Sequence, residues 1–134
     1  MRKTLTKKQI EERDKIIFER EIDWDQEGSG GIMRFRELDI VQLEQLNEKG
    51  LLDLEDYQND SPSVKEFMAF MKKYPAVTAI GYVVSPKRDD VRVSLEGIEC
   101  EQAEVTPELK DDFIEMCRYA DELEIKKGLY AWWD

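Results

Sequence analysis

Histidine is absent from this sequence, and cysteine is scarce, because the chain has only Cys100 and Cys117 and no CxxC motif. Catalytic triads of the Ser-His and Cys-His types need a histidine base, so both are excluded. Two isolated thiols favour neither a disulfide framework nor a zinc site. We therefore expect reduced cysteines, as in a cytoplasmic protein, and no cofactor. Cys117 lies on an apolar stripe and is expected to be buried, which leaves Cys100 as the candidate exposed thiol.

Phosphate-binding signatures and long apolar runs are also missing. The stretch 28–31 is rich in glycine but has neither the Gly-Lys-Ser/Thr ending of a P-loop nor the GxGxxG spacing of a dinucleotide site. It is therefore interpreted as a flexible connector. No apolar run approaches the length of a membrane span. Residues 1–8 are basic and lead into no apolar segment, so we expect a flexible N-terminus without a secretory signal and no membrane partner.

The composition is that of a folded but highly charged chain. The sequence has 134 residues, of which 41% are hydrophobic and 38% are charged, and its formal net charge is −11. This length and hydrophobic content predict a single globular domain over residues 1–134. Because residues 1–8 are basic, the remainder is more acidic than the whole. Such a body repels phosphate backbones, so no nucleic-acid partner is expected.

The clearest local signals lie between residues 61 and 98. Apolar residues recur at i, i+3, i+4 and i+7 over 64–74, which predicts a helix that Pro75 ends. Two starts fit this helix: Ser61 can be the cap before a first-turn proline, or Ser63 can form a capping box with Glu66.

A β-hairpin is predicted after this helix. The segment 76–84 is β-branched and nearly uncharged, which indicates a central strand covered on both faces. The segment 91–97 begins with strict alternation of apolar and polar residues, which indicates a half-exposed strand. The charged loop 85–90 between them is expected to be solvated.

Weaker signals organise the rest of the N-terminal half. A helix is expected over 6–21, and an extended segment over 32–36. Asp39 and Gln42 form the pattern of a capping box, which predicts a helix over 39–49. Gly50 is a typical left-handed stop at the end of that helix, and an acidic loop, 53–60, follows.

The sequence of the C-terminal third predicts further strands and a further helix. Alternation over 98–101 indicates an edge strand, and Gly97 marks a turn or a bulge before it. Thr106 and Pro107 predict the start of a helix that ends near residue 120. The tail 122–133 reads as a second hairpin, with a helical extension as the competing interpretation. The predicted class is α+β, with three or four helices packed on a small antiparallel sheet around the hairpin 76–84 and 91–97.

One acidic segment resembles the first half of an EF-hand calcium loop. Asp23, Asp25 and Glu27 occupy positions 1, 3 and 5, and a glycine occupies position 6. The pattern then fails, because position 8 is Gly30 and position 12 is Arg34, where a bidentate acid is required. These acids remain the candidate metal ligands, but a solvated acidic loop is the favoured interpretation.

The strongest charge imbalance lies in residues 98–124, which hold ten acids against two basic residues. A surface of this kind attracts basic proteins. The aromatic C-terminus adds two tryptophans, of which one is expected to dock in the core and the other to be exposed as a binding anchor. The candidate partner-binding residues are Glu99, Glu101, Glu104, Asp111, Asp112, Trp132 and Trp133.

The favoured function is a cytoplasmic, non-enzymatic interaction, inhibitor or accessory module that binds an unidentified basic protein through its acidic surface. No catalytic residue is assigned. One alternative is a carboxylate-based binder of Ca²⁺, Mg²⁺ or Mn²⁺, or an enzyme that depends on such a metal. A second alternative is a winged-helix DNA-binding protein, suggested by three helices followed by a hairpin but opposed by the acidic charge. The acidity can also serve solubility alone.

Overall fold

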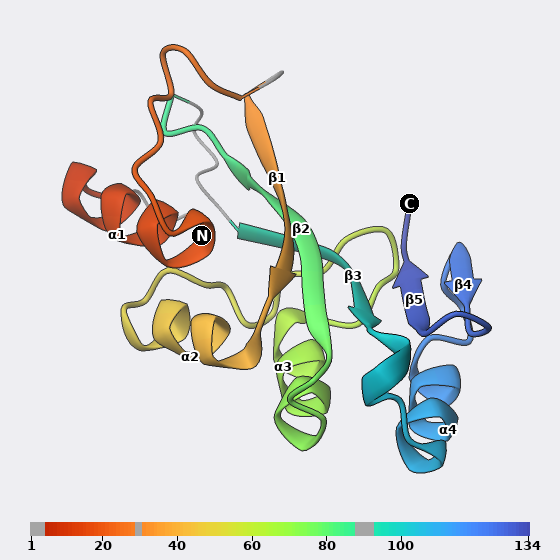
Figure 1. The fold of residues 1–134 in the computed structure, drawn as a ribbon. Coiled ribbons are helices and arrows are strands. Elements are labelled where there is room, and N and C mark those ends of the chain that lie inside the picture. Colours follow the sequence, from red (N-terminus) through yellow and green to blue (C-terminus); the bar gives the residue numbers. More distant parts are fainter. Residues whose placement is uncertain (1–4, 29–30, 88–92) are drawn as a thin grey trace.

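The computed structural model describes residues 5–28, 31–87 and 93–134. In these residues the chain forms four α-helices, one short 3₁₀ helix and five strands (Figure 1). The strands form one antiparallel sheet in the order β1-β2-β3-β5-β4, which confirms the α+β class. The elements are α1 (Lys7–Phe18), β1 (Ile32–Leu38), α2 (Ile40–Glu48), α3 (Val64–Lys73), β2 (Thr78–Val84), β3 (Val93–Cys100), η1 (Gln102–Glu104), α4 (Pro107–Met116), β4 (Glu122–Glu124) and β5 (Leu129–Trp132).

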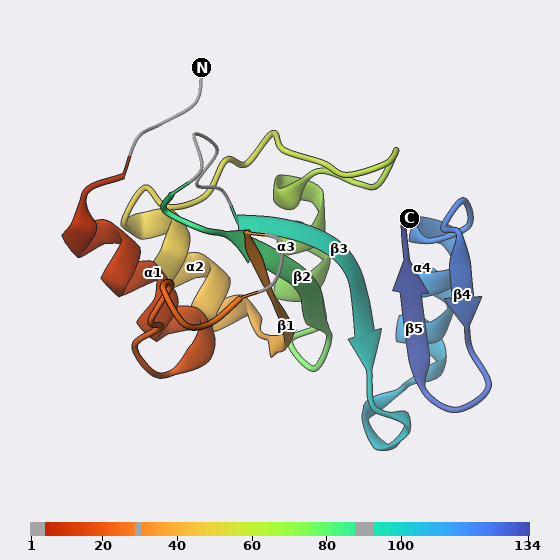
Figure 2. The same cartoon turned by 90° about the horizontal axis from the view of Figure 1, so that it is seen from above.

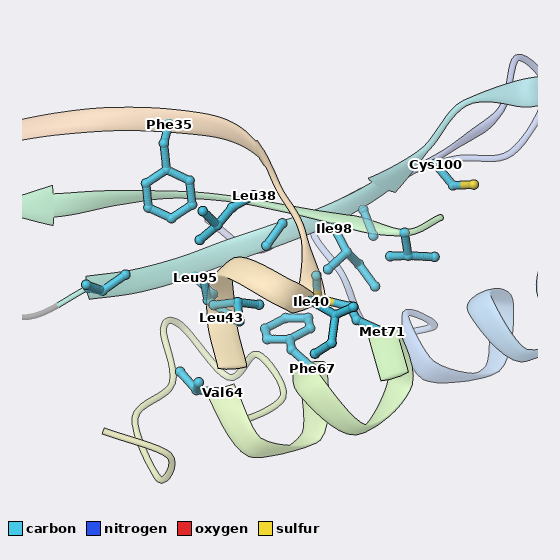
Figure 3. Close-up of a cluster of buried hydrophobic side chains, with 14 of the residues drawn as sticks. Phe35, Leu38, Ile40, Leu43, Val64, Phe67, Met71, Leu95, Ile98 and Cys100 are labelled. Carbon is cyan, nitrogen blue, oxygen red and sulfur yellow. The ribbon is translucent and has the colours of Figure 1, made fainter. Parts of the chain in front are cut away.

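The hydrophobic core lies between the sheet and the helices. Side chains of β1 and β3, such as Phe35, Leu38 and Ile98, point toward Phe67 and Met71 of α3 (Figure 3). Helix α4 lies against the C-terminal hairpin of β4 and β5 (Figure 2). The helix predicted over 64–74 is thus confirmed, and its apolar stripe is buried. None of the helices in the described ranges has the length and apolarity that a membrane span requires.

Capping boxes begin three of the helices. The side chains of Thr6, Asp39 and Ser63 each accept a hydrogen bond from the backbone N–H three residues later, and the residue there bonds back. The box predicted for Asp39 is confirmed. Of the two starts that fit α3, the structure has the one capped by Ser63. Each box satisfies two backbone N–H groups that the helix itself cannot pair.

Removing one of these caps should cost a measurable part of the stability. We expect Asp39→Ala to lower the free energy of unfolding by about 1 kcal/mol, because its carboxylate accepts from the Gln42 N–H at 2.8 Å. Urea denaturation measures the change. The control is Gln45→Ala, an exposed position inside the same helix, which should leave stability nearly unchanged. Equal stability of both variants would contradict the role of the cap.

Two helix ends show how left-handed residues stop a helix. Gly50, with φ of 70°, follows α2, and the Leu51 N–H reaches the Leu46 carbonyl at 2.9 Å. The predicted stop at Gly50 is confirmed. The prediction that the first helix reaches residue 21 was wrong, since α1 ends at Phe18. Glu19 there has φ of 60°, and its N–H closes the last turn on Lys15.

The predicted half-exposed role of β3 was wrong, whereas β2 is an interior strand, as predicted, since it lies between β1 and β3. β3 lies at the middle of the five strands and is buried along most of its length, whereas the exposure of β2 alternates over most of its length. The strict alternation in β3 reflects its polar residues, and these are covered by partners from distant elements. Arg34 of β1 forms a salt bridge with Glu96 across β2, and Ser94 stands directly opposite Tyr82. Residues 88–92, which include part of the predicted loop and strand start, lie outside the described ranges.

The prediction of a separate edge strand over 98–101 was wrong. β3 continues to Cys100, and a β-bulge lies in its pairing with β2, where the register shifts between Ile80 and Gly81. The predicted C-terminal hairpin is confirmed, with β5 joining β3 to β4. β3 thus pairs with β2 through one edge and, at its C-terminal end, with β5 through the other.

Candidate functional site

Most acids of the predicted interaction segment lie at the surface of η1, α4, β4 and their connections, at one side of the molecule (Figure 1). Glu101, Glu104 and Asp111 are exposed, and none of them forms an ion pair with another described residue. We define the acidic surface as the exposed acids of these elements: Glu101, Glu104, Glu108, Asp111, Glu115, Asp121, Glu122 and Glu124.

Two of the candidate partner residues are already engaged within the protein. Glu99 binds the Arg36 guanidinium through both carboxylate oxygens, with distances from 2.9 to 3.2 Å. Asp112 accepts hydrogen bonds from the Tyr74 hydroxyl and from Lys73, the latter at 3.1 Å. Sequence reasoning could not find these pairs, because their members are far apart in the chain. Glu99 and Asp112 are therefore less available to a partner than Glu101, Glu104 and Asp111.

The contact between Tyr74 and Asp112 makes a testable prediction about acid strength. Desolvation, followed by the hydrogen bond to Asp112, raises the pKa of Tyr74 from 10.0 to about 12. Because the folded pKa is raised, the contribution of Tyr74 to stability is complete below pH 10 and is lost as the pH rises toward 12. The difference in ultraviolet titration between the wild type and Tyr74→Phe measures this pKa.

Asp112→Asn is the companion variant for that titration. It removes the negative charge but keeps the side-chain size, so the pKa of Tyr74 should fall only part of the way, because desolvation is the largest cause of the shift. A Tyr74 phenol that titrates at its ordinary pKa in the wild type would contradict the prediction.

The two tryptophans of the C-terminus have different environments. Trp133 is 2% exposed and packs edge-on against Phe67, with ring centres 5.6 Å apart. Trp132 is half-buried and pairs with Gly97 of β3. Trp133 therefore closes the core and is out of reach of a partner. The most exposed aromatic side chains in the described ranges are Tyr57 and Tyr119, at 61% and 80%, which the sequence analysis did not single out.

The acids of the EF-hand-like segment lie close together but bind cations of the protein itself. Glu27 accepts two hydrogen bonds from Arg20, the shorter at 2.7 Å, and one from the Asp23 N–H. Asp25 forms a short ion pair with Lys87. Arg20 and Lys87 hold the pKa values of Glu27 and Asp25 below their ordinary range. Among the described residues, no group of three or more acids, cysteines or histidines is placed to hold a metal ion.

A buried polar cluster lies behind this segment. Arg13 is fully buried in α1, where its guanidinium bonds the Asp14 carboxylate at 2.9 Å and the Val84 carbonyl at 3.1 Å. The Trp24 indole N–H also donates to Asp14, at 2.8 Å. The cluster thus joins α1, the EF-hand-like segment and the end of β2. Sequence reasoning missed it, because an adjacent Arg-Asp pair on a charged helix normally faces solvent.

A hollow of about 330 Å³ lies over the EF-hand-like segment. It is lined by Trp24, Asp25, Gln26, Glu27, Gly28, Gly31, Ser85 and Lys87. The charged groups of its wall are paired with each other or with Arg20, as described above. This hollow therefore presents no free acid–base pair for catalysis.

Both thiols are buried, contrary to the expectation for Cys100. Cys117 and Cys100 are 0% and 5% exposed, and neither forms a disulfide. Burial raises the pKa of Cys117 to about 12. It also raises the pKa of Cys100, which the nearby Glu104 and Glu101 raise further. Neither thiol therefore has the character of a nucleophile.

A scan against protein-family models and searches of curated proteins and of solved structures found no match for this chain.

Proposed function

We propose that this protein is a non-enzymatic, cytoplasmic interaction module that binds a basic protein through the acidic surface. The observation that carries the proposal is the exposed, unpaired state of Glu101, Glu104 and Asp111 relative to the described residues. Carboxylates that are not neutralised internally produce a negative electrostatic potential that attracts a basic partner. Such a field speeds encounter with a basic protein and selects against acidic ones. An inhibitor or accessory protein of a nucleic-acid enzyme fits this description.

Two free, buried cysteines support the cytoplasmic location. No observation favours the alternative functions. The candidate metal ligands Asp25 and Glu27 are paired with Lys87 and Arg20. In the winged-helix alternative, α3 would be the helix that enters the DNA groove. Its Lys73 is instead bound to Glu108 and Asp112 of α4, which places acids beside that helix.

An affinity capture from the lysate of the native host tests the proposal. The protein should retain one dominant basic partner at low salt and release it as the salt rises through about 0.5 M, because the screening length then shortens to a few ångströms. A triple variant, Glu101→Gln, Glu104→Gln and Asp111→Asn, should capture much less of that partner.

The control variant removes the same charge elsewhere. Glu11→Gln, Glu44→Gln and Glu48→Gln lie on α1 and α2 and form no ion pair with a described residue. This control should capture the partner as the wild type does. Equal losses in both triple variants would show a response to net charge only, and the absence of any basic partner at low salt would overturn the proposed function.

A further inference from the structure

Three of the four large hydrophobic side chains that are exposed in the described ranges lie in two short acidic segments. Tyr57 belongs to the connection from α2 to α3, Tyr119 to the connection from α4 to β4, and Leu123 to β4 itself. Their exposures are 61%, 80% and 39%. Single exposed apolar residues are ordinary, but a concentration of them marks an interaction site. We define the tyrosine face as these three side chains with the acids of segments 53–60 and 119–124.

The fold brings the two segments to the same end of the molecule. The backbone of Val64 and Lys65, in the first turn of α3, donates to the carbonyls of Asp56 and Leu54, which fixes the loop of Tyr57 on that helix end. One turn later, Phe67 packs on Trp133. Both views show this loop beside the C-terminal end of β5 (Figures 1 and 2).

The C-terminus is bonded to the segment of Tyr119. The Asp134 N–H donates to the Asp121 carboxylate at 2.8 Å, two residues after Tyr119. The loop of Tyr57 is further held by the Tyr82 hydroxyl, which lies 3.4 Å from the Gln58 side-chain oxygen. Both exposed rings are thus carried by bonded segments, so a partner that binds them meets a largely formed surface.

The charged residues within the two segments are all acidic, although Arg118 directly precedes Tyr119 and lies against its ring. Residues 53–60 contain four acids, and residues 119–124 contain three, and neither segment contains a lysine or an arginine. A partner for this face must therefore supply positive charge together with groups that pack on aromatic rings. Arginine combines both properties, because its planar guanidinium stacks on rings and binds carboxylates through two hydrogen bonds.

The protein already holds a guanidinium at one of these rings. The central carbon of the Arg118 guanidinium lies 4.8 Å from the centre of the Tyr119 ring, and Arg118 also binds Glu115 at 2.9 Å. This contact shows how a guanidinium can pack on an aromatic ring and bind a carboxylate at this face. Tyr119 is still 80% exposed, so the ring has room for a second contact.

We propose that the tyrosine face is the docking site for an arginine-rich segment of a partner protein, with Tyr57 and Tyr119 as the anchors. This inference rests on the proposed function and specifies where and by what chemistry the basic partner binds. The face shares Asp121, Glu122 and Glu124 with the acidic surface and extends it to the loop of Tyr57. Tyrosine and arginine are among the side chains that most often dominate the binding energy of interfaces.

Labelled oligo-arginine and oligo-lysine peptides of equal length test the inference by fluorescence anisotropy at low salt. The wild type should bind oligo-arginine more tightly than oligo-lysine. The double variant Tyr57→Ala, Tyr119→Ala should lose this preference, with each substitution weakening oligo-arginine binding about fivefold. Because both rings are exposed, the double variant should melt at nearly the wild-type temperature.

The matched control is Val41→Ala, which removes an exposed apolar side chain from α2 and should change neither affinity. Wild-type binding that the double variant retains in full, with the same preference for arginine, would overturn the inference and leave the proposed function standing. A wild type that binds neither peptide at low salt would overturn both.

Discussion

Replacing Gly81 with alanine is expected to lower the free energy of unfolding by about 3 kcal/mol or more. Gly81 lies in β2, at the bulge in the pairing with β3. A Cβ atom there would come within 1.9 Å of the Ser94 carbonyl oxygen and within 2.8 Å of the Phe35 ring. The first contact is with backbone, so it can be relieved only by moving β3, the middle strand of the sheet.

Urea denaturation of Gly81→Ala and of Thr78→Ala measures this effect with an internal control. Thr78 is a half-exposed position in the same strand, and its substitution should cost less than about 1 kcal/mol. A Gly81→Ala protein as stable as Thr78→Ala would show that the two strands can separate at the bulge, which the close packing of the core opposes.

The second large effect is expected at the buried pair of Arg13 and Asp14. Asp14→Ala should destabilise the protein by about 3–5 kcal/mol, because it removes the carboxylate that forms an ion pair with a fully buried guanidinium. It also removes the acceptor of the Trp24 indole N–H. Burial already lowers the pKa of Arg13, an effect that the Asp14 carboxylate opposes, so the loss of Asp14 removes the group that favours the charged form.

A double variant separates the cost of removing one member of the pair from the value of the pair. Arg13→Met with Asp14→Asn removes both charges, keeps similar volumes, and leaves an amide oxygen for Trp24. Because buried ion pairs contribute little beyond an apolar replacement, the double variant should recover at least half of the stability lost in Asp14→Ala. Chemical denaturation of both variants tests this, and a double variant less stable than Asp14→Ala would contradict it.

The elements predicted correctly have signals confined to a few neighbouring residues. The capping box of Asp39 and the stop at Gly50 each depend on contacts within a single turn, so their residue types predict them directly. The buried stripe of α3 is similar, because the helical period alone places its apolar side chains on one face.

The errors concern relations between distant residues. The position of β3 in the sheet depends on its pairing with β5, where Gly97 stands opposite Trp132. The burial of Glu96 depends on Arg34, which lies 62 residues earlier in the chain. Neither relation leaves a periodic trace in the sequence, so alternation was misread as exposure.

In the candidate interaction site, too, the local property was predicted and the contacts between distant residues were not. Composition alone predicted an acidic surface, since the exposed acids outnumber the nearby cations. It could not show that Glu99 and Asp112 are engaged by Arg36 and Lys73, because these ion pairs are tertiary. The sequence predicted that one of the two C-terminal tryptophans docks in the core but not which one. The packing on Phe67 shows that it is Trp133.

The burial of Trp133 also affects how the chain folds during synthesis. β5 and Trp133 emerge from the ribosome after the other described elements, yet β5 joins β3 to β4 and Trp133 covers Phe67 in the core. Until they arrive, the C-terminal end of β3 has one unpaired edge and the apolar face of α3 is incompletely covered. A nascent chain in that state exposes the features that chaperones bind. Completion of the core therefore has to wait until β5 and Trp133 have emerged, however early the local helices form.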